Sequence, residues 1–282
     1  MGFQINNNVA AFNAYRNLSV TQNSVSSSLE KLSSGLRINR AADDAAGLAI
    51  SEGLRSQVGG LKVAVRNAQD GISVVQTAEG ALSTSTSILQ RMRDLSVQAA
   101  NDGGLNASAK GNIQKEIVQL REELTRISDT TQFNGKKLLD GTYNGAFQVG
   151  ANGGEQIAVA IGTDMDATGL GLNTIDVTTP AAAGPPAVPS GAQSAIALID
   201  TAIGTVSTAR ADLGAKQNRL EMTIKNLNVS VENLSASESR IRDTDMAAEM
   251  VSFTKSQILS QAGTAMLAQA NQMGQGVLSL LR

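Results

Sequence analysis

The sequence predicts a mainly α-helical fold, an elongated antiparallel helical bundle or coiled coil with a small β-hairpin region. Two observations carry this prediction. Five segments of the 282-residue chain repeat apolar residues at alternating gaps of three and four, which is the spacing of one helix face. Aromatic residues make up only 2% of the chain, so its core has to be built from aliphatic side chains.

The two ends of the chain are predicted helices. The N-terminal one has an apolar stripe, preceded by Ile5, Val9 and Phe12 in a looser register; its members are Leu18, Val25, Leu29, Leu32 and Leu36. The C-terminal stripe consists of Leu259, Ala262, Met266, Met273, Val277 and Leu280. Each stripe indicates an amphipathic helix.

Three further stripes predict the helices between these ends. They run from Leu61 to Ala99, from Ile113 to Ile127 and from Ile196 to Ile241. The last is unbroken, and at 1.5 Å per residue it predicts a helix on the order of 65 to 70 Å long. One such stripe is equally typical of a globular bundle, but five together favour long helices packed side by side.

A different pattern occupies residues 130–191. The dipeptides Asn134-Gly135, Asp140-Gly141 and Asn144-Gly145 predict hairpin turns, because these residues accept a positive φ at low cost. Strands are expected over residues 146–149 and 156–161. The following segment, 169–191, is poor in charge and holds all four prolines, which predicts a surface loop without a packed core of its own.

Charge is scarce at both ends. Residues 1–29 contain only Arg16, and residues 246–282 contain only Glu249, Lys255 and Arg282. Burial of the terminal helices on all sides within an assembly would explain this, and flexible tails are the alternative. The two explanations agree if the ends gain order only on polymerisation, so we expect their folding to be coupled to assembly.

The composition argues against most other classes of function. The chain has no Cys and no His, which removes the thiolate nucleophile, the commonest general base and the commonest metal ligands. We therefore predict no enzymatic activity, no catalytic residue, no metal site and no cofactor. Asp43 and Asp44 are expected to cap a helix or to lie on a helix surface. The net charge of −2 argues against a nucleic-acid partner. The lack of a long apolar run argues against a membrane partner.

Several stretches resemble the bacterial flagellins, which form the filament of the flagellum. The most specific is SSGLRINRAADDAAGLAIS at residues 33–51, followed by QFNGKKLLDG at residues 132–141. ESRIRDTDMAAEM at residues 238–250, ILSQAGTAMLAQANQ at residues 258–272 and the terminal VLSLLR resemble the flagellin C-terminus. The resemblance covers roughly the first 150 and the last 90 residues.

The resemblance implies paired terminal helices and a minimal subunit without large outer domains. Residues 1–43 and 237–282 would form an inner-tube terminal coiled-coil domain. Residues 44–165 and 190–236 would form an outer-tube helical rod with β-hairpins, and residues 166–189 a short variable surface loop. The residues expected at the self-assembly interface are Ile5, Val9, Phe12, Leu18, Val25, Leu29, Leu32, Met266, Met273, Val277 and Leu280.

The resemblance also implies partners and a location. The subunit would polymerise with itself in the extracellular filament, after type III export without a cleaved signal peptide; the N-terminus shows no such leader. It would meet an export chaperone, the filament cap and hook-associated junction proteins. Innate immune receptors are implied as well, with Arg91, Leu95 and Glu116 at the matching positions.

Three alternatives to a filament subunit stand beside this interpretation. A hook-filament junction protein shares terminal helices with the flagellins. A monomeric coiled-coil adaptor or membrane-surface binder also uses amphipathic helices, although it would want Lys and Arg on their polar face. An enzyme is the third alternative.

Overall fold

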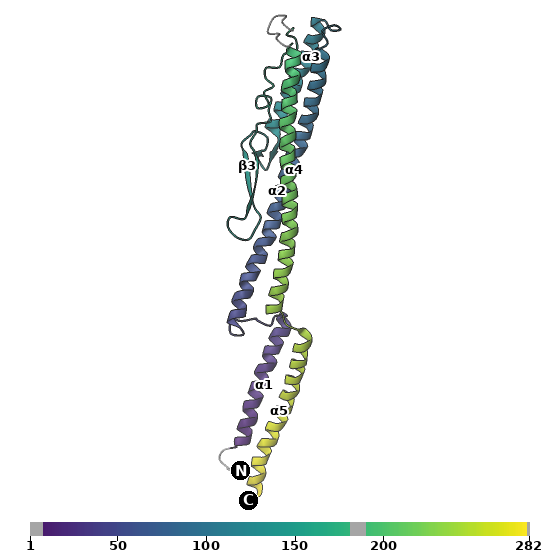
Figure 1. Ribbon diagram of the computed structural model, residues 1–282. Helices are drawn as coiled ribbons and strands as arrows, with labels where there is room; N and C mark the ends of the chain where they lie inside the picture. The colour runs from purple at the N-terminus through teal and green to yellow at the C-terminus, as the bar shows by residue number, and fades with distance from the viewer. Residues whose placement is uncertain (1–7, 181–189, 281–282) are drawn as a thin grey trace. The chain divides into compact units, whose positions relative to one another are not determined.

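The computed structural model describes the backbone of residues 8–180 and 190–280 and the side chains up to residue 272 (Figure 1). This part of the chain is mainly helical, as predicted. Its helices are α1 (Val9–Ser34), α2 (Ala45–Ala99), α3 (Ala107–Thr130), α4 (Gly191–Arg242) and α5 (Met246–Leu280). Its strands are β1 (Gln132–Phe133), β2 (Lys136–Lys137), β3 (Tyr143–Gln148) and β4 (Gln156–Ile161).

The chain divides into two compact units. Unit 1 consists of Met1–Val58 and Glu232–Arg282, and unit 2 of Gly59–Val231. Helices α2 and α4 contribute residues to both units. The predicted division at residues 43/44 and 236/237 concerns layers of a filament and stays a prediction.

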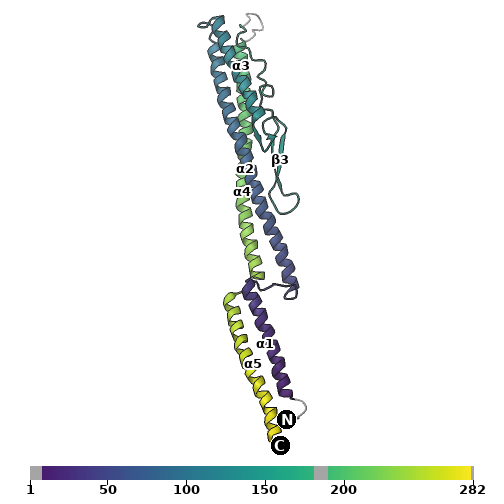
Figure 2. The same cartoon turned by 180° about the vertical axis from the view of Figure 1, so that it is seen from behind.

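Unit 2 has a continuous apolar core. Its helices α2, α3 and α4 lie side by side in both views (Figures 1 and 2). Buried residues of α2 follow the heptad spacing and include Ala68, Val75, Leu82 and Leu89, each fully buried. Helix α4, the predicted unbroken helix, has 52 residues, but α2 is longer with 55. Helix α2 starts at Ala45, well ahead of Leu61, the first apolar residue of its predicted stripe.

Two antiparallel hairpins lie in unit 2. The turn between β1 and β2 is Asn134-Gly135, with φ angles of 48° and 77°, as predicted from its sequence. The turn predicted at Asn144-Gly145 is wrong, because both residues lie inside β3 and pair with Ala160 and Val159 of β4. Pairing along all six residues of β4 is what holds its alternate side chains in the core, so the turn falls after Gln148.

The segment after β4 is irregular but buried in part. Met165, Leu170, Leu172, Ile175 and Val177 all belong to the core of unit 2. The prediction of a surface loop over residues 166–189 is therefore wrong for residues 166–177, whose apolar side chains pack on the helices. Residues 181–189 lie outside the described part of the chain.

Helix α1 is shorter than its stripe predicted. Gly35 caps it with φ 73° and its backbone N–H donates to the Lys31 carbonyl at 2.8 Å. This left-handed conformation ends a helix and suits glycine. The chain direction changes there, so Leu36 lies outside the helix and forms an isolated antiparallel bridge with Asp243.

Candidate assembly surface

Helices α1 and α5 lie side by side in both views, as the resemblance to the flagellins implied (Figures 1 and 2). Asn8 ties their ends together, because its side chain donates from Nδ2 to the Ala270 carbonyl at 2.9 Å and accepts from the Ala11 amide at 3.1 Å. The less exposed residues of each helix recur at alternating gaps of three and four, which identifies a coiled-coil seam. The seam consists of Ala11, Ala14, Leu18, Thr21, Val25, Ser28 and Leu32 on α1, and of Phe253, Ser256, Ser260, Gly263, Leu267 and Ala270 on α5.

Small residues dominate this seam. A Cβ atom on Gly263 would lie 3.2 Å from Leu18 Cδ1, so the two helices approach closely at this point. Ser28 and Ala270 are the buried residues of the seam, and its larger side chains stay half-exposed. The pair therefore removes little apolar area from water.

Apolar side chains also cover the outside of both helices. We define the outer faces as Val9, Phe12, Tyr15, Val20 and Leu29 on α1, and Met250, Val251, Ile258, Leu259 and Met266 on α5. Each of these ten side chains is 50 to 70% exposed. In the heptads set by the seam, Phe12, Val251 and Ile258 fall on the side turned away from it.

The outer face of α5 forms a shallow apolar groove. Met250, Val251, Ile258 and Leu259 line it together with Thr254 and Lys255. Lys255 and Glu249 are the two charged residues of α5. A water-facing helix normally carries more charge than this, so α5 has the composition of a covered helix.

The structure separates the predicted interface residues into three groups. Val9, Phe12, Leu29 and Met266 are on the outer faces, whereas Leu18, Val25 and Leu32 are half-buried in the seam of the same chain. Ile5 lies outside the described residues, and so do the side chains of Met273, Val277 and Leu280.

Sequence reasoning missed part of the outer faces. It passed over Tyr15, Val20, Met250, Val251 and Ile258, because these residues do not belong to the stripe that was read on each helix. The signal that could have found them is the near absence of charge on both helices.

The link between α1 and α2 is held by carboxylates. Asp43 Oδ2 accepts from the backbone amides of Arg40 at 2.9 Å and Asn39 at 3.0 Å, and these hydrogen bonds lower the pKa of Asp43. Asp44 Oδ1 accepts from the Gly47 amide at 2.8 Å at the start of α2. Asp44 thus caps α2, as predicted, whereas Asp43 caps no helix and instead stabilises the link ahead of it.

Further bonds join this link to the end of α4. The Arg37 amide donates to the Arg242 carbonyl at 2.6 Å and the Thr244 amide to the Gly35 carbonyl at 3.0 Å. Arg242 forms an ion pair with Glu52 at 2.7 Å. The two helix breaks of unit 1 are therefore bonded to each other.

The three positions matched to immune receptors differ in accessibility. Arg91 on α2 and Glu116 on α3 form an exposed ion pair, with N–O distances of 2.9 and 2.7 Å. Leu95 is 3% exposed and belongs to the core. A molecule in contact with this surface reaches the ion pair but not Leu95.

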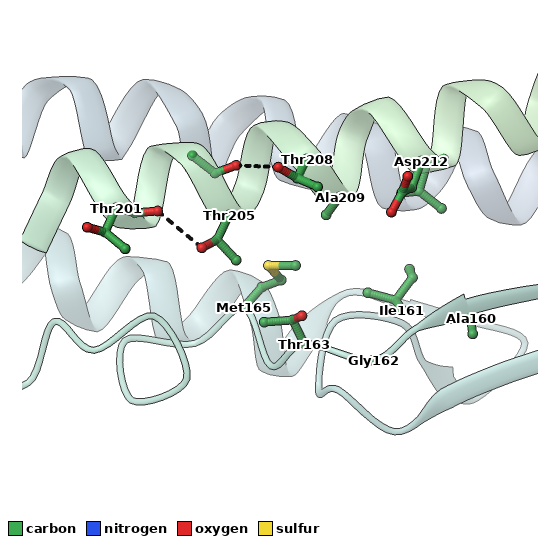
Figure 3. A pocket seen from close by; sticks show the side chains of 12 residues that line it. Ala160, Ile161, Gly162, Thr163, Met165, Thr201, Thr205, Thr208, Ala209 and Asp212 are labelled. Atoms are coloured by element: carbon green, nitrogen blue, oxygen red, sulfur yellow. Dashed lines mark hydrogen bonds between the residues drawn. The ribbon is translucent and has the colours of Figure 1, made fainter.

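A cavity in unit 2 lies between α4 and the segment around Met165 (Figure 3). Its volume is about 470 Å³, and Asp212 is the charged residue among those that line it. The hydroxyls of Thr201, Thr205 and Thr208 each donate to the carbonyl four residues earlier on α4. Their protons are engaged inside the helix, so these hydroxyls gain no activation from a neighbouring base.

Neither a metal centre nor a membrane span is found in the described part of the chain. No group of three or more acidic or other metal-binding side chains gathers there. Its helices contain no stretch that is long and apolar enough to cross a bilayer.

Comparison with known proteins gives consistent matches. The model of the bacterial flagellin N-terminal helical region matches residues 5–144, and that of the C-terminal helical region matches residues 196–281. Flagellin of Bacillus subtilis (strain 168) is 52% identical, over 99% of this chain and 100% of its own. Flagellin of Halalkalibacterium halodurans is 54% identical, over 99% of both chains.

A solved structure also bears on the fold. A structure assigned to a flagellar hook-associated protein of Vibrio parahaemolyticus aligns with a TM-score of 0.60, over 71% of this chain and 100% of its own. Its sequence identity is 15%, so the likeness concerns the fold alone. The much higher identity to the two flagellins favours a filament subunit over a junction protein.

Proposed function

The chain belongs to the bacterial flagellin family and is a structural subunit of the flagellar filament, and on this premise we propose that it polymerises through the outer faces of α1 and α5. The observation that carries the proposal is that a two-helix seam of small residues leaves ten large apolar side chains 50 to 70% exposed. Four of these side chains line one apolar groove on α5, and a contiguous exposed apolar patch of this kind marks an interaction site.

The energetics agree with this role. A large apolar side chain contributes about 1.5 to 3 kcal/mol when it passes from full exposure to full burial. Covering the ten half-exposed side chains of the outer faces would supply on the order of 10 kcal/mol per subunit. This gain has to offset the freedom lost on association, which the repetition of one contact along a polymer makes feasible.

The polar residues of the terminal helices support a contact between identical chains. Most of them are Asn, Gln, Ser and Thr, at positions where solvated helices carry charges. Amides and hydroxyls can satisfy one another across a subunit contact, whereas an unpaired buried charge would be costly.

The finer partners belong to the same proposal. We infer that an export chaperone, the filament cap and hook-associated junction proteins meet the terminal helices, and that export uses the type III route without cleavage of a leader. The support is the resemblance of residues 238–282 to the flagellin C-terminus together with the uncovered face of α5. For innate immune receptors, the accessible matching positions are Arg91 and Glu116.

Two lysine substitutions test the assembly faces. Phe12→Lys and Ile258→Lys place a charge on the side of each helix turned away from the seam, and lysine is a good helix former. We expect both variants to fold as the wild type does, by circular dichroism, but to form no filaments in a salt-induced assembly trial viewed by negative-stain microscopy.

Met222→Lys is the matched control. Met222 is 69% exposed on α4 in unit 2, so the same change adds the same charge away from the outer faces. We expect normal filaments from this variant. Filaments from Phe12→Lys and Ile258→Lys at the wild-type protein concentration would contradict the proposal.

A further inference from the structure

Methionine carries all the sulfur of this chain. The sequence has eight Met and no Cys, and it also lacks the oxidisable Trp and His. Two-electron oxidants therefore have the thioethers as their principal targets. Met92 and Met165 are protected in the core of unit 2, with at most 1% exposure.

Among the side chains that the structure describes, four other methionines are open to solvent. Met222 is 69% exposed on α4, and Met246, Met250 and Met266 on α5 are 48%, 50% and 68% exposed. Met250 lines the apolar groove of α5 next to Val251. Met266 follows Leu259 by one heptad on the same side of α5. Two exposed thioethers thus lie within the outer face of α5.

We propose that Met250 and Met266 are a redox-modification site, at which a peroxide-class oxidant converts the free subunit into a form that does not polymerise. The inference rests on the proposed function of the outer face. It adds that the oxidation state of Met250 and Met266 decides whether a neighbouring subunit can cover that face.

The reaction balances with hydrogen peroxide as the oxidant. A sulfur lone pair attacks one peroxide oxygen, an S–O bond forms and the O–O bond breaks. The displaced hydroxide takes up the remaining peroxide proton and leaves as water. Sulfur is oxidised by two electrons to the sulfoxide, and peroxide is reduced.

The sulfoxide changes the face from apolar to polar. Its oxygen accepts hydrogen bonds from water, and a neighbouring subunit that covers the groove with apolar side chains would strip that water away without a replacement. Thr254 and Lys255 are the polar residues that line the groove. The Thr254 hydroxyl donates to the Met250 carbonyl at 2.8 Å, and Lys255 lies five positions after Met250, whereas neighbours on a helix surface lie three or four positions apart. The modified side chain therefore favours the free subunit over the assembled one.

The experiment compares two double variants with the wild type. Met250→Leu with Met266→Leu removes the two thioethers at nearly constant volume. Met222→Leu with Met246→Leu is the matched control, which removes two equally exposed thioethers outside the outer face. Each full-length monomer is treated with hydrogen peroxide, the peroxide is removed with catalase, and peptide mass spectrometry measures sulfoxide at every Met before a salt-induced assembly trial.

We expect peroxide to abolish filament formation by the wild type and by the Met222/Met246 control, whereas the variant lacking Met250 and Met266 keeps it. Normal filaments from wild-type subunits with sulfoxide at both positions would overturn the inference. Equal loss of assembly by the variant lacking both thioethers would also overturn it. The single variants Met250→Leu and Met266→Leu replace the double variant if untreated double variant does not assemble.

The untreated lysine variants separate this inference from its premise. If Ile258→Lys still polymerises, the proposed outer face is wrong. If Ile258→Lys fails to polymerise and oxidised wild type succeeds, the assembly face stands and only the redox site fails.

Discussion

Units 1 and 2 are built from the same heptad spacing but reach different degrees of closure. In unit 2, aliphatic residues from Ala68 to Leu220 form one buried cluster. Among the described residues of unit 1, only Ile38 and Ala270 are buried apolar side chains. A flagellin subunit thus combines a part that completes its own core with a part that leaves its apolar surface open.

The number of helices explains the difference. In unit 2, α3 and the irregular segment 165–177 pack beside α2 and α4, so that apolar stripes meet partners on more than one side. The α1–α5 pair offers each helix one partner and a narrow seam. A two-helix coil covers one stripe of each helix, so a helix that is apolar on two sides needs a further partner.

The sharpest way to break this comparison is to separate the units. We expect a fragment of residues 44–236 to fold into a soluble, cooperatively melting helical protein that forms no filaments, because the closed core lies within it. Circular dichroism and negative-stain microscopy check the two outcomes. Normal filaments from the fragment would show that the terminal helices are dispensable.

Hydrogen exchange on the intact monomer complements this test. Amides in α1 and α5 should exchange much faster than those in the parts of α2, α3 and α4 that belong to unit 2. Local unfolding of unit 1 exposes little additional apolar surface, so it costs little free energy. Equal protection in dilute monomer would contradict the coupling of terminal folding to assembly.

A matched pair of leucine substitutions sharpens the comparison quantitatively. Leu89 is fully buried in unit 2, and Leu18 is half-buried in the seam. Leu89→Ala should lower the free energy of unfolding by about 3 to 4 kcal/mol, because it leaves a cavity that the core cannot refill. Leu18→Ala removes the same atoms from a site that water already reaches, so we expect about 1 kcal/mol.

Urea denaturation of both monomers measures these values, with the wild type as reference. Equal destabilisation by the two substitutions would mean that unit 1 is as closed as unit 2, contrary to the exposure of its apolar residues.

The sequence pattern was sufficient for the helical class and the Asn134-Gly135 turn, because periodicity and turn chemistry are local, whereas the pairing of the two ends was implied by the resemblance to the flagellins. It was insufficient for choosing which side of α5 faces α1. The predicted stripe followed the apolar spacing of Leu259, Ala262 and Met266, whereas the seam uses the small side chains of Ser256, Ser260 and Gly263. A helix that is apolar on two sides has two equally good stripes, and close approach to a specific partner decides between them.

The irregular segment after β4 failed for a related reason. Low charge and proline content indicate the lack of regular structure, but they do not indicate where the segment lies. Leu172 and Val177 are fully buried because α3 positions the segment: the Gln114 side chain donates to the Ile175 carbonyl and accepts from the Val177 amide, both at 3.0 Å. Such a long-range contact leaves no local pattern.

The smallest predicted effect concerns acid and the link between α1 and α2 in unit 1. The pKa of Asp43 lies below its ordinary value of 3.8, chiefly because the amides of Arg40 and Asn39 donate to the carboxylate, with help from the positive charge of Lys31. A lowered pKa means that the folded link favours the charged form. Its contribution to stability is complete above pH 3.8 and is lost as the pH falls through the lowered pKa.

Protection of the Asn39 and Arg40 amides against hydrogen exchange, followed by NMR from neutral pH into acid, measures this contribution. Asp43→Asn keeps the shape of the side chain but removes its charge. The Asn39 and Arg40 amides of this variant should therefore be less protected than those of the wild type at neutral pH. The difference should vanish in acid. Asp176 in unit 2 is the internal control: its pKa is also lowered, by hydrogen bonds from Thr178, yet its neighbours Ile175 and Val177 are buried in the core. Acid should therefore loosen the link of the open unit while the segment around Asp176 keeps its protection, and equal loosening of both would mean that core packing does not set the acid response of the two units.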